Sequence, residues 1–138
     1  MRGLLDAAEV LHLSFQDEQG PYSVPVNFAR VQDTLYIHSG RKGRKAATLK
    51  RGVEVAFSAV ASLEPKTGPQ ACNFSYSFES VAGAGTSRLV EDEQERNRGM
   101  LAINGKYGAG GLEMSAKIFT KTVIIALDLT TVTARIHQ

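Results

Sequence analysis

Residues 36–51 read YIHSGRKGRKAATLKR, which predicts the end of a β-strand, a glycine-containing turn and the start of a short helix. Six cations and no acid lie between Arg41 and Arg51. Glycine lets the backbone approach a ligand closely, the Ser39 hydroxyl can donate a hydrogen bond, and a helix beginning after Gly43 leaves N–H groups unpaired at its positive end. Together these features suit a phosphate group. The alternative interpretation is a basic turn whose charges face solvent.

The rest of the chain has an ordinary globular composition. With 138 residues, 43% of them hydrophobic and 22% charged, we expect a single domain over residues 1–138. The net charge of +2 is too small to indicate a nucleic-acid partner. The lone Cys72 excludes a disulfide within one chain and favours a reducing, cytoplasmic location. No run approaches the ~20 apolar residues of a membrane span, so no membrane partner is expected.

Alternating apolar and polar residues predict a meander of antiparallel strands in the N-terminal part. A short helix is expected to end near residue 8, followed by strands over residues 11–15, 22–28 and 34–38. Pro25 cannot donate a hydrogen bond to a ladder, so the second strand is expected at a sheet edge, bulged, or open on one side.

The middle of the chain predicts two more strands. Residues 53–60 alternate cleanly, whereas residues 61–70 contain two prolines and a glycine and are expected to form a loop. A long β segment over residues 71–90 is interrupted by Gly83 and Gly85. Glycine inside a strand indicates a bulge, a sharp bend, or a ligand lying against the backbone.

The C-terminal part predicts one helix and two strands. Asp92, with Glu95 three residues later, is a helix-start signal, and the helix is expected to end near Lys106. Residues 108–111 are expected to form a flexible loop, and the last segments, 118–127 and 129–136, are rich in β-branched residues. Six or seven strands with two or three short helices argue for a mainly β protein, an antiparallel barrel with helices outside it.

Several familiar catalytic patterns are absent. The three histidines lack metal-ligand spacing, so no metal site is expected. Gly83-Ala84-Gly85 begins like a dinucleotide-binding motif, but Arg88 stands where the third glycine would be. Cys72 lies among strand residues and is more typical of inert packing than of a nucleophile. The sequence therefore identifies no catalytic residue.

Three segments in this order resemble the pyridoxamine 5′-phosphate oxidase-like, FMN-binding split-barrel family, nearest its nitroimidazole-resistance (Nim-type) branch. They are residues 21–28 (PYSVPVNF), residues 35–45 (LYIHSGRKGRK) and residues 80–85 (SVAGAG). The likeness extends from about residue 4 to residue 107. It implies an antiparallel split β-barrel with Greek-key-like topology, and a homodimer that holds FMN in a groove between its subunits.

The resemblance also implies which residues contact the cofactor. One group grips the flavin phosphate, a strand lies along the isoalloxazine ring, and small residues of a later strand line the flavin from another side. His38 either packs under the phosphate loop or contacts the cofactor or substrate. In chain order the implied contacts are Val24, Pro25, Val26, Asn27, His38, Ser39, Arg41, Lys42, Arg44, Lys45, Ser80, Val81 and Gly83.

The activity implied by the resemblance is that of an FMN-dependent oxidoreductase. Hydride would pass from NADH or NADPH through the flavin to a small electron-poor substrate, as in a nitroreductase. Two alternatives remain open: a flavin- or haem-binding protein without turnover, and a deazaflavin-dependent reductase. The chain departs from the family in having no tryptophan and no C-terminal glycine-lysine pair, which affects the expected substrate pocket. Replacing Arg44 and Lys45 with alanine is expected to weaken flavin binding and leave the fold intact.

Overall fold

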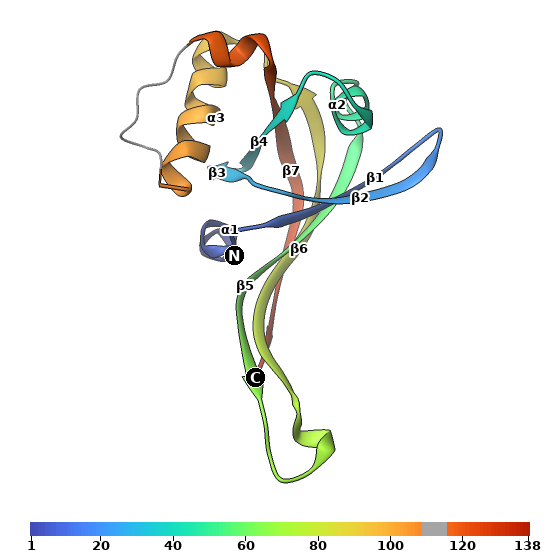
Figure 1. Ribbon diagram of the computed structural model, residues 1–138, viewed down its shortest axis with the longest axis vertical. Coiled ribbons are helices and arrows are strands. Elements are labelled where there is room, and N and C mark those ends of the chain that lie inside the picture. The colour runs from blue at the N-terminus through green and yellow to red at the C-terminus, as the bar shows by residue number, and fades with distance from the viewer. Residues whose placement is uncertain (109–115) are drawn as a thin grey trace.

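The computed structural model describes residues 1–108 and 116–138, and shows a curled, seven-stranded antiparallel sheet with three short α-helices around it (Figure 1). The strand order is β2-β1-β5-β6-β7-β4-β3. In chain order the elements are α1 (Arg2–Ala7), β1 (Leu11–Asp17), β2 (Gly20–Val26), β3 (Ala29–Val31), β4 (Thr34–Gly40), α2 (Arg44–Leu49), β5 (Glu54–Lys66), the 3₁₀ turn η1 (Ala71–Asn73), β6 (Ser75–Leu89), α3 (Glu93–Lys106), the 3₁₀ turn η2 (Ala116–Thr120) and β7 (Thr122–His137).

The barrel is open at one seam. β2 and β3 follow one another in the chain, yet they form the two ends of the sheet and are not paired with each other. This arrangement confirms the predicted antiparallel split barrel, and it confirms that the strand containing Pro25 is an edge strand. None of the helices formed by the described residues is long and apolar enough to cross a membrane.

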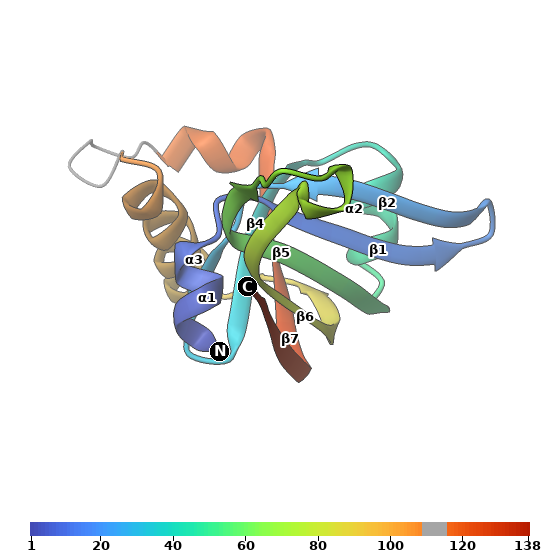
Figure 2. The same cartoon turned by 90° about the horizontal axis from the view of Figure 1, so that it is seen from below.

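The barrel interior is filled by alternate residues of its strands. Leu13 of β1 is buried opposite Phe57 of β5, and Leu11 and Val55 are buried in the same cluster, as the period-two pattern predicts. Leu5 of α1 is fully buried in the same cluster. Seen from below, α1 and α3 lie on one side of the curved sheet and α2 lies on the other, beside β1 and β2 (Figure 2).

Helix α3 covers part of the outer face of the sheet. The Asp92 carboxylate accepts a hydrogen bond from the backbone N–H of Glu95, which confirms the predicted helix start. Met100 and Ile103 then pack on Ile124 in a second apolar cluster outside the barrel. One face of α3 is therefore committed to packing.

A charged network fixes α3 to the strands beneath it. Arg88 makes two hydrogen bonds of 2.7 Å to Glu95 and one of 2.7 Å to Asp128 of β7. The Tyr36 hydroxyl also donates to Glu95, at 2.7 Å. The Arg88 guanidinium, more than any other group, lowers the pKa of Glu95 to about 2, so this carboxylate stays charged at neutral pH.

β5, β6 and β7 continue beyond the barrel as a projecting ribbon (Figure 1). The predicted loop over residues 61–70 is wrong in its first part, because β5 runs to Lys66 with a register shift after Val60. Pro65 is tolerated there, opposite Tyr76, because β1 pairs with β5 only up to Ser58 and the far edge of β5 is open. Cys72 lies at the tip of the ribbon and is exposed, so the expectation that it is packed is also wrong.

The C-terminal strand differs from its prediction in two ways. Residues 118–120, expected to be strand, belong to η2, and β7 is one continuous strand rather than two. Asp128, where the two predicted strands were divided, is paired with Thr86 in the ladder, and the register shift of β7 falls at Thr130 instead. Of the flexible loop predicted over residues 108–111, Gly108 lies in the described part of the chain. Residues 109–111 lie outside the described residues.

Candidate functional site

An open hollow of about 390 Å³ lies between the end of β2, the end of β4 and the start of α2. We call it the β2–β4 hollow. Its volume is within the ~300–1,000 Å³ usual for small-molecule sites. Six residues line it: Val10, Pro25, Val26, Asn27, His38 and Lys45. All of them except Val10 were predicted as cofactor contacts.

The strand wall of the hollow is formed by β2 and the residue that follows it. Pro25 and Asn27 are exposed, whereas the side chain of Val24 packs against the barrel core. Val26 is nearly buried but still lines the hollow. The outward face of this wall therefore has few hydrogen-bonding groups: no amide hydrogen at Pro25 and one side-chain amide at Asn27.

His38 and Lys45 form the other wall. His38 points outward from β4 and lines the hollow beside Lys45. Partial desolvation lowers the pKa of His38, and the nearby Lys45 ammonium lowers it further. The imidazole is therefore neutral at pH 7, and the positive charge of this wall is carried by Lys45.

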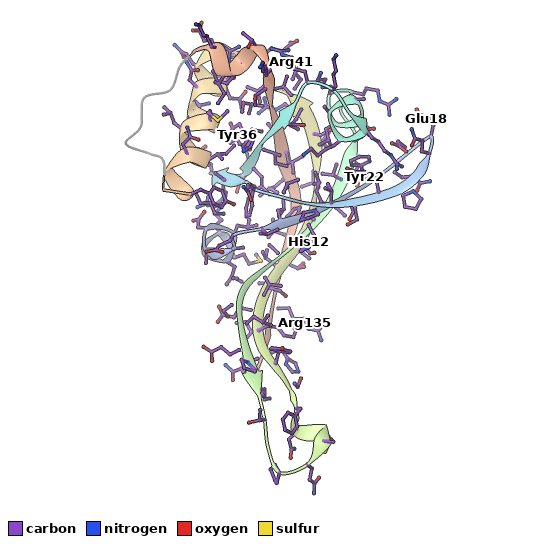
Figure 3. The ribbon with its side chains drawn as sticks, viewed as in Figure 1. His12, Glu18, Tyr22, Tyr36, Arg41 and Arg135 are labelled. Carbon is purple, nitrogen blue, oxygen red and sulfur yellow. The ribbon has the colours of Figure 1, made fainter. Side chains whose placement is uncertain are left out.

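Two lysines of the basic stretch remain available for an anion. Lys42 is exposed in the turn and Lys45 faces the hollow, and neither forms an ion pair within residues 1–108 and 116–138. Arg41 is directed elsewhere. Its guanidinium donates to the backbone carbonyls of Phe119 and of Thr120, the latter at 2.9 Å, and so fastens η2 to the turn (Figure 3).

Arg44 serves the fold rather than the hollow. Its guanidinium makes two 2.7 Å hydrogen bonds to Asp17 and one of 3.0 Å to the Gly20 carbonyl, and it lies 4.8 Å from the centre of the Tyr22 ring. The Asp17 side chain is only 4% exposed, and the Arg44 hydrogen bonds are the main cause that lowers its pKa from 3.8 to about 2. Figure 3 shows Tyr22 on the β1–β2 hairpin below α2. Replacing Arg44 and Lys45 together therefore removes a contact within the fold as well as a cation, and intact folding of that variant stays a prediction.

The remaining predicted residues do not line the hollow. Ser39 is buried, and its hydroxyl donates to the Gly40 carbonyl at 3.0 Å. Val81 is buried in the barrel core, and Ser80 lies half-buried on β6. Packing within the chain explains why residue 83 is a glycine, because a Cβ there would lie 2.1 Å from the Thr131 carbonyl oxygen.

The family model for pyridoxamine 5′-phosphate oxidase matches residues 1–136. The chain belongs to this family. The comparison with curated proteins found no match for this pyridoxamine 5′-phosphate oxidase family member.

Solved structures support the family's fold for this chain. A candidate 5-nitroimidazole antibiotic resistance protein from Bacteroides thetaiotaomicron superposes with a TM-score of 0.81 at 25% identity, covering 96% of this chain and 80% of that one. An FAD- and haem-binding protein from Mycobacterium smegmatis gives 0.85 at 21% identity, covering 98% and 68%. A candidate pyridoxamine 5′-phosphate oxidase from Listeria innocua gives 0.62 at 21% identity, covering 98% and 93%.

Sequence reasoning missed three residues that shape the site of this family member. Val10 precedes β1 and was not assigned to any element, although it lines the hollow. Asp17 ends β1 and is the ion-pair partner of Arg44, a contact that the sequence did not predict. Tyr107, just after α3, has its hydroxyl bonded to Phe28 and Glu9 beside the hollow. Only tertiary structure brings these residues to the site, so no local pattern could have found them.

Proposed function

We propose that the chain binds FMN in the β2–β4 hollow and acts as an FMN-dependent oxidoreductase. The observation that carries the proposal is the convergence of Lys45, which has no ion pair in the described part of the chain, with the exposed strand edge at Pro25 and Asn27. One wall suits a phosphate and the other suits a flat ring. When bound, FMN supplies hydride transfer between a nicotinamide donor and a small electron-poor acceptor.

Each wall has a distinct role in this proposal. Lys45, with Lys42 beside it in the turn, holds the phosphate through charge-assisted hydrogen bonds. The ring lies along Pro25, where no backbone N–H is left buried without a partner. The Asn27 amide bonds a polar edge of the ring, and the neutral His38 imidazole donates or accepts one hydrogen bond at the ring or at the substrate.

FMN is preferred over FAD because, among the described residues, Lys45 is the one cation that lines the hollow, with Lys42 exposed in the turn near it. Two neighbouring lysines suit one phosphate monoester, whereas FAD carries a pyrophosphate and an adenosine that need further partners. The Mycobacterium smegmatis neighbour binds FAD. Tighter binding of FAD than of FMN would therefore assign the hollow to the larger cofactor.

We expect the double substitution Lys42→Ala and Lys45→Ala to weaken FMN binding by on the order of 10–100-fold, because it removes the charge-assisted contacts to the phosphate. Quenching of flavin fluorescence on titration gives the Kd, and the melting temperature should stay near that of the wild type. The control is Lys66→Ala, which removes a cation from the projecting ribbon. A wild-type protein that binds no FMN, or a double variant that binds it equally well, would contradict the proposal.

A second candidate function is flavin or haem binding without turnover, favoured by the likeness to the FAD- and haem-binding protein. The two candidates differ in one measurement. The FMN-loaded protein should oxidise NADH or NADPH in the presence of a nitroaromatic or quinone acceptor, under anaerobic conditions. Tight flavin binding with no oxidation of either nicotinamide would leave only the binding function.

We further propose that the chain is a homodimer whose contact includes the projecting ribbon. Exposed apolar side chains gather there, and such patches mark interfaces between proteins. They are Val60, Leu63, Phe74, Tyr76 and Ile136. The open edge of β5 beyond Ser58 adds unpaired backbone groups to the same region.

The ribbon variant Leu63→Glu is expected to convert the dimer to a monomer, because it places a charge in the apolar contact. Sedimentation velocity at micromolar concentration measures the state of both proteins. Leu101→Glu is the matched control, since Leu101 is similarly exposed but lies on α3. A monomeric wild-type protein would remove the dimer from the proposal.

A further inference from the structure

The Tyr107 hydroxyl joins two chain segments on either side of the β2–β4 hollow. It accepts a hydrogen bond from the Phe28 backbone N–H at 3.2 Å and donates one to the Glu9 carbonyl at 2.5 Å. Phe28 directly follows Asn27, and Glu9 directly precedes Val10, and both of these neighbours line the hollow. A single phenol from the end of α3 therefore fixes both segments.

These two segments are the continuations of a β-ladder. The pairing of β1 with β2 ends at Leu11 opposite Val26. Carried on for two more residues, the same register would place Glu9 opposite Phe28. The structure instead shows the strands separated at this point, and the hollow opens there.

Pro25 indicates which type of antiparallel residue pair is expected where Glu9 lies opposite Phe28. Pro25 is opposite His12 and has no N–H, so this pair is of the type that exchanges no hydrogen bonds. Because the two types alternate along an antiparallel ladder, Glu9 and Phe28 fall on the hydrogen-bonded type. In a regular ladder the Phe28 N–H would donate directly to the Glu9 carbonyl, and the hydroxyl of Tyr107 now stands between them.

We infer that Tyr107 is a positioning residue that keeps the hollow open. A direct N–H···O=C bond brings nitrogen and oxygen to about 2.9 Å. An inserted hydroxyl replaces that bond by two in series, so both backbone groups stay satisfied while the strands remain apart at Val10 and Asn27. The inference deepens the proposed function and rests on it in one respect, namely that the molecule in the hollow is FMN.

Lys106 holds the end of α3 in place independently of the hydroxyl. Its ammonium lies 3.6 Å from the centre of the Phe28 ring and donates to the Leu5 carbonyl at 3.3 Å. Removal of the Tyr107 hydroxyl alone should therefore leave the helix end and the ring where they are. This makes Tyr107→Phe a test of the spacer rather than of the helix.

Tyr107→Phe is expected to weaken FMN binding roughly tenfold, because the strands close on each other or leave a backbone group without a partner. Tyr36→Phe is the matched control. It removes a phenol hydroxyl that donates to Glu95 of α3 and belongs to a residue that does not line the hollow, and it should change the Kd by less than about twofold. The visible circular dichroism of bound flavin should change in Tyr107→Phe only. Equal Kd values for wild type and Tyr107→Phe, or an equal loss in both variants, would overturn the inference.

A crystal structure of Tyr107→Phe without cofactor separates this inference from the proposed function. We expect the Phe28 nitrogen to approach the Glu9 carbonyl directly and the hollow to become smaller. Unchanged separation of Val10 and Asn27 would show that the hydroxyl is not a spacer, whether or not the wild type binds FMN. If the wild type binds no FMN but the strands close in the variant, the proposal that FMN occupies the hollow would be wrong. The inference that the Tyr107 hydroxyl is a spacer would still hold.

Discussion

Arg44→Ala is expected to lower the melting temperature by roughly 5–10 °C, the largest effect for any cation of the basic stretch. The substitution removes both 2.7 Å hydrogen bonds from Asp17 and leaves a carboxylate that is 4% exposed without its ion-pair partner. Among the described residues, only the Gln19 N–H and the Thr48 hydroxyl still donate to it. It also removes the link from α2 to the Gly20 carbonyl in the β1–β2 hairpin. Thermal unfolding followed by far-UV circular dichroism at pH 7 measures the shift.

Arg51→Ala is the control for Arg44, because it breaks a second ion pair on the same hairpin. Arg51 bonds Glu18 at 3.0 Å, but these side chains are 52% and 79% exposed. Exposed ion pairs contribute little to the free energy of unfolding, so the melting temperature should change by no more than about 2 °C. Similar shifts for the two variants would mean that the Asp17 pair stabilises the protein no more than a surface pair does.

The Asp17 pair also predicts how stability depends on pH. The folded protein holds the pKa of Asp17 at about 2, below its ordinary 3.8. At pH values between these two pKa values the unfolded chain therefore binds more protons than the folded protein. The stabilisation is fully present above pH ~4 and is lost as pH falls through about 2. Urea midpoints measured from pH 2 to 6 should therefore rise with pH in the wild type and rise less in Arg44→Ala. Parallel curves for the two proteins would contradict this linkage.

Local patterns in the sequence were sufficient for much of the fold. Alternation along residues 11–15 gave the correct inward face of β1, since a strand with one buried face needs period two. Asp92 marked the start of α3 because a side-chain acceptor satisfies an unpaired N–H of the first turn. Pro25 limited its strand to an edge, a bulge or an open side, because a missing donor is harmless there, and β2 is an edge strand.

The partners of the charged residues could not be predicted in the same way. The basic stretch presents its arginines and lysines as equivalent, but folding brings a buried carboxylate to Arg44 and carbonyl oxygens to Arg41, and leaves Lys45 at the hollow. Each of these contacts joins residues far apart in the chain. Pro65 misled for a related reason: its tolerance depends on an open edge of β5, which is a property of the whole sheet.

Gly83→Ala is expected to destabilise the protein by roughly 1–3 kcal/mol, by overpacking against the backbone of the neighbouring strand. The added Cβ would lie 2.1 Å from the Thr131 carbonyl oxygen and 2.8 Å from the Phe57 ring. Thr131 belongs to β7, which is paired with β6 on both sides of this point. Urea denaturation of the cofactor-free variant measures the loss.

Gly105→Ala gives the opposite sign for the same chemical change. Gly105 lies within α3, and a Cβ there meets nothing within 4 Å. Alanine in a helix is favoured over glycine, so the variant should gain about 0.5–1 kcal/mol. The contrast tests why position 83 is a glycine. If Gly83→Ala kept wild-type stability but lost FMN, the small residue would be required by the flavin. If the variant loses stability without any flavin present, the small residue is required by the close approach of β6 to the Thr131 backbone of its paired strand β7.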